Sequence, residues 1–272
     1  MLFVPGTADA LPGLALQGLL DWLLQLFIAT LRCGGFLIAA PMFGARQIPV
    51  MVRIVLSVAL GLLVLQIVPL PSPQILATPA VLPVIATELA IGLTAGLVLT
   101  IFFAAASVAG DRIAATSGLG FAAQFDPMGG GQTPVVSQFF ALFLVAIFLA
   151  QEGHLAALSI LIDSYRIIPV GAPANLPALT AAGIAAGGQM LFLAALIMLP
   201  VVAALLLINI TIGVITRSAP QLNLFSFGFP VTLLATFALL FVNVPHLAHA
   251  FADLTGAALA ALRDMIGGLA DG

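Results

Sequence analysis

The stretch QMLFLAALIMLPVVAALLLINITIGVIT, residues 189–216, contains no charged side chain. A helix needs about 20 predominantly apolar residues to cross about 30 Å of hydrocarbon, and this stretch exceeds that length. Arg217 follows it, and a second apolar stretch runs from Phe225 to Ala250. Arg217 is the only charged residue between Ile167 and Ala252. The pattern therefore predicts two long membrane helices joined by a short turn that carries this arginine.

Similar apolar stretches recur along the rest of the chain. Together with the first two, they predict six membrane helices at Leu14–Ala40, Val50–Leu70, Val81–Ala109, Pro134–Ile160, Gln189–Thr216 and Phe225–Ala250. The connections 69–83 and 169–177 contain five and three prolines, so neither is a continuous helix. The sequence predicts an all-α integral membrane protein with one membrane-embedded domain over residues 1–272.

Composition excludes several classes of protein. Of the 272 residues, 62% are hydrophobic and only 6% are charged, whereas about a quarter of the residues of a soluble domain are charged. Lysine is absent and the net charge is -3, so no basic surface is available for nucleic acid. The single Cys33 is expected to be a packing residue, and no metal-ligand spacing or nucleophile set is present. We expect no enzymatic activity, no cofactor and no metal site.

The distribution of arginines favours one orientation. The first, third and fifth connections carry four of them, whereas the even connections and the termini carry two: Arg46, Arg53, Arg112 and Arg217 against Arg166 and Arg263. Loops rich in Arg and Lys stay in the cytoplasm. The odd-numbered connections are therefore expected to be cytoplasmic and the termini external.

The C-terminal residues 251–272 form an amphipathic tail. Apolar side chains recur there at helical spacing at Leu254, Ala258, Leu259, Leu262 and Ile266. A short helix lying in the membrane interface is the default interpretation. A helix that docks on a partner is the alternative.

Residues 118–133, GLGFAAQFDPMGGGQT, interrupt the helical pattern between the third and fourth spans. Irregular backbone at membrane depth must be buried in protein or line a wet cavity, because lipid cannot satisfy its amides. The segment is either a surface turn built on Asp126-Pro127 and loosened by Gly129–Gly131, or part of a transport pathway. In the second interpretation Phe121, Phe125 and Met128 are apolar groups on a glycine-rich tether that could occlude a pore.

Glu88 is the only charged residue of the third span. An acid in a membrane helix is a functional candidate, although Glu88 lies near the start of the span and could reach the interface. A structural or assembly role is favoured over proton transfer. Gly92 and Gly96, four residues apart on the same helix, would let another helix approach closely.

The turn RSAPQLNLFSFGFP, residues 217–230, strongly resembles the signature of the FliR family, the flagellar members of the type III export-gate proteins. Further matches follow in the family's order: Glu88–Gly92, Phe125–Pro127, Gly153–Leu155, Asp163–Tyr165 and Pro169–Gly171. Only the N-terminal dozen residues and the C-terminal tail have no match. The ending Gly228-Phe229-Pro230 is more typical of the flagellar branch than of the virulence-secretion branch.

The resemblance implies a subunit of a closed conical channel in the bacterial inner membrane, within the flagellar basal body. The implied partners are FliP-like and FliQ-like subunits, FlhA-like and FlhB-like neighbours, membrane lipid, and the unfolded flagellar proteins that pass through the channel. The resemblance also implies that the helices form broken hairpins, partly raised above the bilayer.

The family places a plug in the loop that matches residues 118–133. The resemblance therefore implies a pore plug formed by Gly118, Phe121, Phe125, Asp126, Pro127, Met128, Gly129, Gly130 and Gly131. Residues expected to act in assembly or gating are Glu88, Gly92, Gly96, Arg217, Pro220, Gln221, Asn223, Phe225, Gly228 and Pro230. The alternatives are a virulence-type export-gate subunit, a secondary transporter that couples an ion through Glu88, and a membrane scaffold without a pore surface.

Overall fold

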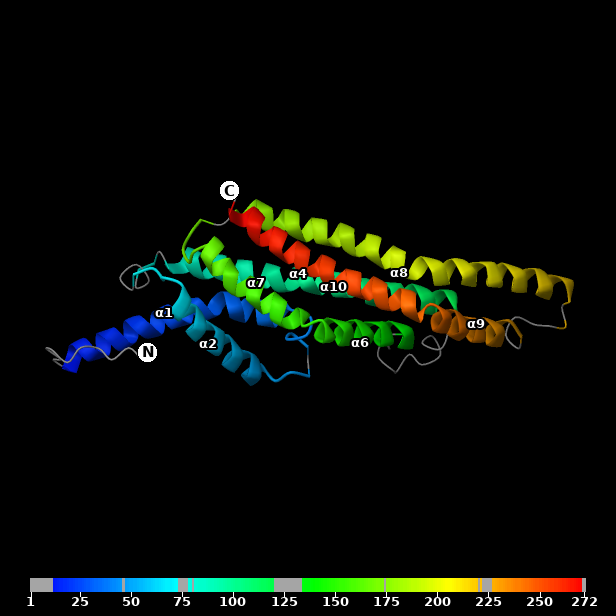
Figure 1. Ribbon diagram of the computed structural model, residues 1–272, viewed down its shortest axis with the longest axis horizontal. Helices are drawn as coiled ribbons and strands as arrows, with labels where there is room; N and C mark the ends of the chain where they lie inside the picture. The colour runs from blue at the N-terminus through cyan, green and yellow to red at the C-terminus, as the bar shows by residue number, and fades with distance from the viewer. Residues whose placement is uncertain are drawn as a thin grey trace. The chain divides into compact units, whose positions relative to one another are not determined.

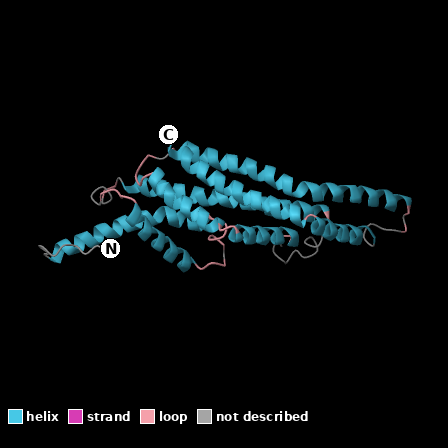
Figure 2. Cartoon of the chain, viewed as in Figure 1, coloured by secondary structure: helices cyan, strands magenta, loops and turns pink. Residues whose placement is uncertain are grey.

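The computed structural model describes residues 12–45, 47–72, 78–79, 81–119, 134–173, 175–219, 221 and 227–270. Every regular element in these ranges is a helix (Figures 1 and 2). The helices are α1 (Pro12–Ala39), α2 (Val50–Ile67), α4 (Val81–Thr116), α6 (Val135–Ala150), α7 (Gly153–Ile167), α8 (Leu176–Ser218), α9 (Phe229–Val242) and α10 (Val244–Ala270). The predicted all-α membrane fold is confirmed.

The number of candidate spans depends on how the bent helices are counted. Four helices are long and apolar enough to cross a membrane: α1, α2, α4 and α8. Two pairs pass the same test only together, and each is bent, by 68° between α6 and α7 and by 64° between α9 and α10. The six predicted spans are therefore all present among the described residues, but the fourth and sixth are broken rather than straight.

The bend between α6 and α7 has a local cause. Glu152 has a positive φ of 56°, which ends the regular helix. Next to it, a Cβ at Gly153 would lie 2.5 Å from the ring of Phe148, so only glycine fits there without a shift. Thr255 Oγ1 donates to Gln151 Oε1 at 2.5 Å and thereby attaches the bend to α10. The sequence Gln151-Glu152-Gly153 therefore specifies a corner.

The bend between α9 and α10 lies at Asn243. The Asn243 side chain donates to the carbonyl of Leu239 at 2.8 Å, which satisfies a carbonyl at the end of α9. Pro245 stands in the first turn of α10, where its missing N–H costs little. Helix α10 then continues without a break to Ala270, so the predicted tail is the continuation of this helix, and its interfacial or partner-docking role stays a prediction. Leu254, Leu262 and Ile266 of the tail are buried in the chain itself.

The chain divides into two compact units. The first comprises Met1–Leu97, Ser159–Leu179 and Met265–Gly272, and the second comprises Val98–Leu158 and Thr180–Asp264. The prediction of one membrane-embedded domain stays a prediction. In the first unit, α1 and α2 pack together, and the core includes Ile28, Phe36 and Ile91.

Aromatic side chains form much of the second unit's core. Phe140 and Phe251 meet edge to face with centroids 5.4 Å apart, and Phe103 and Phe148 do so at 5.1 Å. Such edge-to-face pairs are favourable beyond the apolar area they bury.

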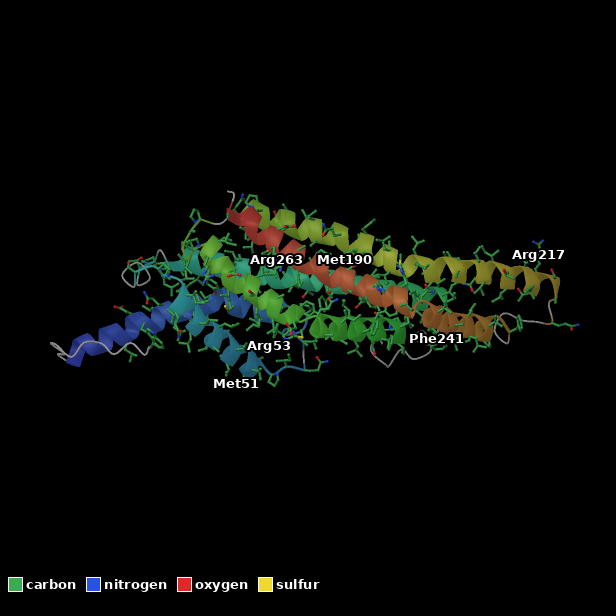
Figure 3. The ribbon with its side chains drawn as sticks, viewed as in Figure 1. Met51, Arg53, Met190, Arg217, Phe241 and Arg263 are labelled. Carbon is green, nitrogen blue, oxygen red and sulfur yellow. The ribbon has the colours of Figure 1, made fainter. Side chains whose placement is uncertain are left out.

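Arg217 lies at the C-terminal end of α8, where its side chain is exposed (Figure 3).

Candidate functional site

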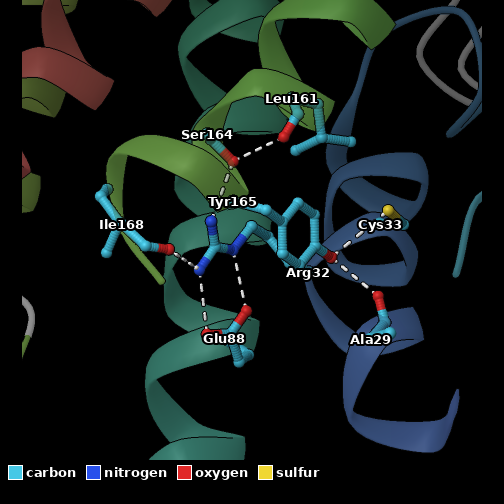
Figure 4. Close-up of polar contacts among 8 residues, drawn as sticks. All are labelled: Ala29, Arg32, Cys33, Glu88, Leu161, Ser164, Tyr165 and Ile168. Atoms are coloured by element: carbon cyan, nitrogen blue, oxygen red, sulfur yellow. Dashed lines mark hydrogen bonds and ion pairs between the residues drawn. The ribbon is translucent and has the colours of Figure 1, made fainter. Parts of the chain in front are cut away.

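Two charged residues from different helices meet inside the first unit. Arg32 of α1 is fully buried and Glu88 of α4 is 1% exposed. Arg32 Nε donates to Glu88 Oε2 at 2.8 Å and Arg32 Nη2 donates to Glu88 Oε1 at 2.9 Å (Figure 4). This is the bidentate geometry that matches a planar guanidinium to a carboxylate. Both oxygens of Glu88 are therefore held by one arginine.

The other donors of Arg32 bind the C-terminal end of α7. Nη1 donates to Ser164 Oγ at 3.0 Å, and Nη2 donates to the Ile168 carbonyl at 3.0 Å (Figure 4). The carbonyls in the last turn of a helix lack partners within the helix and carry partial negative charge. The guanidinium thus caps α7 from a helix far away in the sequence.

Tyr165 of α7 packs between the Arg32 guanidinium and the backbone of α1. The guanidinium carbon of Arg32 lies 4.2 Å from the centroid of the Tyr165 ring, a cation–π distance. The Tyr165 hydroxyl donates to the Ala29 carbonyl at 2.8 Å and lies 3.4 Å from Cys33 Sγ. Cys33 is fully buried there, as expected for a packing residue. We name Arg32, Glu88, Ser164, Tyr165 and the Ile168 carbonyl the arginine cluster.

Glycines bring the two backbones close enough for the cluster to form. A Cβ at Gly92 would clash with the carbonyl oxygen of Arg32. A Cβ at Gly96 would lie 2.7 Å from both Ala39 Cβ and the Phe36 carbonyl oxygen. The helix that approaches these glycines is α1 of the same chain. The role of Gly92 and Gly96 in assembly or gating stays a prediction.

The arginine cluster joins α1, α4 and α7 through hydrogen bonds among its own members. Burying two charges costs several kcal/mol each unless geometry and hydrogen bonds compensate, and here both conditions are met. The sequence analysis singled out Glu88 but assigned no role to Arg32. A lone base in one span and a lone acid in another are a signal for pairing, because charged residues inside membranes pair with each other.

Most of the predicted plug loop lies outside the described residues. Of its members only Gly118 is described, with a positive φ of 81°. The helices on either side are fixed by side chains. Asn209 Nδ2 of α8 donates to the Thr116 carbonyl at 3.0 Å, and Ser137 Oγ of α6 donates to the Ser107 carbonyl of α4 at 3.1 Å.

The predicted assembly turn is described in part. Arg217 and Gln221 are exposed, and Gly228 is buried at the N-cap of α9. Pro230 is exposed in the first turn of α9. Pro220, Asn223 and Phe225 lie outside the described residues. The arginine cluster belongs to the first unit and this turn to the second.

Comparison with known proteins identifies the family. The family model of bacterial export proteins, family 1, matches residues 23–258. The chain is similar to the flagellar biosynthetic protein FliR of Pectobacterium carotovorum, with 35% identity over 240 residues, 87% of this chain and 92% of the relative. It is similar to the FliR proteins of Escherichia coli K12, with 30% identity over 86% of this chain and 91% of the relative, and of Bacillus subtilis, with 27% identity over 84% and 88%. With its apolar helices, the chain is a membrane protein that belongs to the bacterial export proteins, family 1, the family of the flagellar biosynthetic protein FliR.

Proposed function

We propose that this chain is a non-enzymatic subunit of the flagellar type III protein export gate in the bacterial inner membrane. In this function it completes the channel through which unfolded flagellar proteins leave the cytoplasm, and residues 118–133 plug that channel. The names of its relatives and the signature at residues 217–230 support the flagellar branch over the virulence branch.

The length of α8 is the observation that carries the proposal. Helix α8 has 43 residues, so at a rise of 1.5 Å per residue it is about 64 Å long. The hydrocarbon core is about 30 Å thick, and membrane helices tilt by at most about 40°. A helix of this length therefore extends well beyond the bilayer.

Helix α8 exposes large apolar side chains toward both of its ends. Ile184 near its start is 78% exposed, and Leu207 and Ile210 near its end are 67% and 65% exposed. Ile184 and Ile210 lie 26 residues apart, about 39 Å along the axis, which exceeds the hydrocarbon thickness of about 30 Å unless the helix tilts by about 40°. Large exposed apolar surfaces mark interaction sites. We therefore infer that neighbouring subunits, FliP-like and FliQ-like, cover the part of α8 that lipid does not reach, with FlhA-like and FlhB-like proteins nearby.

The first prediction tests assembly. In cells that express the partner subunits, the double variant Leu207→Asn/Ile210→Asn is expected to co-purify with the FliP-like subunit at least about tenfold less than the parent chain. The double variant loses two aliphatic contacts that a partner would bury, and this loss costs at least the binding free energy that corresponds to a tenfold change. Co-purification from mild detergent with quantitative immunoblotting measures it.

Thr211→Asn is the matched control, because Thr211 is already polar and exposed on the same helix. It is expected to co-purify like the parent chain. Equal recovery of partners by the double variant and this control would refute the role of α8 in assembly.

The second prediction tests the plug. Deleting Gly129–Gly131 is expected to raise ion leak through the assembled gate and to change export of flagellar proteins, because a shorter tether cannot seat Phe121, Phe125 and Met128. Replacing the same three glycines by serines keeps the length and serves as the control. If the deletion alters neither leak nor export, the plug role is lost.

The transporter alternative requires Glu88 to exchange an ion. Its two carboxylate oxygens already bind Arg32, so a coupling ion would have to displace the guanidinium. This pairing weighs against the alternative. Solute transport by the purified chain alone, abolished by Glu88→Gln, would favour it.

A further inference from the structure

Asp111 and Arg112 are neighbours near the end of α4, and both line one cavity. The cavity has a volume of about 330 Å³, and Val108 and Ala115 also line it. Val108, Asp111 and Ala115 follow one another at three and four residues, so they share one face of the helix. Asp111 is half-buried and Arg112 is exposed. The cavity therefore presents an acid and a base between two apolar side chains.

The described residues leave the Asp111 carboxylate unsatisfied. Its Oδ1 is buried and has no hydrogen-bond partner among them. Such atoms are rare in native proteins, because a buried polar atom without a partner costs its full desolvation. Adjacent side chains on a helix do not face each other, and neither ion pair of the described residues joins Asp111 to Arg112. Oδ1 therefore requires a donor that these residues do not supply.

Helix α6 packs against the turn of α4 that carries Asp111. A Cβ at Gly110 would lie 2.5 Å from Ser137 Cα of α6. Ser137 Oγ donates to the carbonyl of Ser107, one turn before Asp111, at 3.1 Å. Ser107 and Gly110 precede Val108 and Asp111 by one residue each, so the cavity lies on the neighbouring face of α4.

Asp111 and Arg112 also stand at the end of an apolar stretch of membrane length. The 22 residues 89–110 contain no charged side chain. At a rise of 1.5 Å per residue they extend about 33 Å, close to the hydrocarbon thickness of about 30 Å. This length places the two charged residues at the level of the lipid headgroups. Pockets with basic residues at this level of membrane helices bind headgroups.

We propose that this cavity binds the headgroup of phosphatidylethanolamine, whose ammonium donates to Asp111 and whose phosphate pairs with Arg112. The headgroup carries both charges on a short linker, so it satisfies an acid and a base that do not pair with each other. An anionic headgroup without an ammonium leaves Oδ1 without a donor, and a quaternary choline has no N–H to donate. The site lies outside the proposed export function and does not require it.

Lipid binding to the purified full chain in maltoside detergent tests the site. Native mass spectrometry of the intact chain measures the dissociation constants of phosphatidylethanolamine, phosphatidylcholine and phosphatidylglycerol with identical acyl chains. We expect phosphatidylethanolamine to bind at least about tenfold more tightly than phosphatidylcholine, because methylation of the ammonium removes a charge-assisted hydrogen bond. Equal binding of these two lipids, or tighter binding of phosphatidylglycerol, overturns the proposal.

Asp111→Asn keeps the shape of the side chain and removes its charge. This variant is expected to bind phosphatidylethanolamine about tenfold more weakly and to lose most of the preference over phosphatidylcholine. The lipid-free variant is expected to unfold at an unchanged or higher temperature, because Oδ1 has no hydrogen bond to lose among the described residues. A lower unfolding temperature together with unchanged lipid preference would show a structural role and overturn the site.

Arg263 and Asp264 provide the matched control. They are an adjacent base and acid on α10, both are exposed, and neither lines the cavity. Arg263→Gln and Asp264→Asn are expected to leave binding of phosphatidylethanolamine unchanged, whereas Arg112→Gln is expected to weaken it about tenfold. Equal losses at the two pairs would show an unspecific attraction of headgroups to charged side chains, which also overturns the site.

A basic side chain of a partner subunit is the other occupant that matches Asp111. In cells that express the partner subunits, Asp111→Asn is expected to co-purify with the FliP-like subunit like the parent chain. Normal assembly with lost lipid preference would separate this site from the proposed export function. Lower recovery of the FliP-like subunit with unchanged lipid preference would assign the cavity to that subunit and overturn the lipid site.

Discussion

Arg32→Leu is expected to lower the free energy of unfolding by about 3 to 5 kcal/mol, because it leaves the Glu88 carboxylate buried without a partner. The substitution also removes the cap on the Ile168 carbonyl and the donor to Ser164. Unfolding of the purified chain by a denaturing detergent, followed by circular dichroism, measures the change. In cells we expect the variant to be depleted from the membrane.

Two controls separate loss of the pair from loss of a charge. In Arg32→Leu/Glu88→Leu no buried charge remains, so much of the stability is expected to return. Arg166→Ala breaks the exposed Arg166–Asp163 pair of 3.5 Å and is expected to cost at most about 1 kcal/mol. If the double variant is as unstable as Arg32→Leu, the unpaired carboxylate is not the cause.

Gly92→Ala is expected to cost about 3 kcal/mol and to separate α1 from α4. The added methyl group would meet the carbonyl oxygen of Arg32, a backbone atom that cannot rotate away. A shift of α1 there moves the Arg32 guanidinium relative to Glu88. We therefore expect the cost of Gly92→Ala to be much reduced when Arg32 and Glu88 are already leucines, since the two effects share one contact.

Gly187→Ala is the matched control for Gly92→Ala. Gly187 also lies inside a long apolar helix, but apart from its chain neighbours and the adjoining backbone of its own helix no atom comes within 4 Å of a Cβ placed there. Alanine is the better helix former, so this variant is expected to be neutral or to gain up to about 1 kcal/mol. Equal losses at the two positions would show that crowding against Arg32 is not responsible.

The apolar helices follow from the sequence because hydrocarbon requires long, uncharged helices. The apolar stretch 189–216 predicts α8, and the second apolar stretch after Arg217 predicts α9 and α10. The structure has helices at all six predicted places. The resemblance implied broken hairpins, but hydropathy did not place the bends, because it averages over the few residues that cause them. Glu152 and Asn243 sit between apolar stretches and do not lower the average enough to separate two helices.

The arginine cluster was only half predicted, because pairing depends on which spans become neighbours. Glu88 was identified from its isolation in the third span, but its partner depends on the fact that α1 crosses α4 at Gly92 and Gly96. Gly92 and Gly96 indicated that another helix approaches closely. The sequence does not show that this helix belongs to the same chain.

The roles of the turn 217–230 and of the plug loop remain predictions.

The two side chains that fix the flanks of residues 120–133 have a mechanical consequence. Asn209 holds the Thr116 carbonyl on one side, and Ser137 holds the Ser107 carbonyl on the other. A force applied to the intervening residues is therefore taken up by α4, α6 and α8 together. Changes between the two attachments should therefore leave those helices little disturbed, so that effects of deleting Gly129–Gly131 on leak and export would arise in the loop and not in the helices.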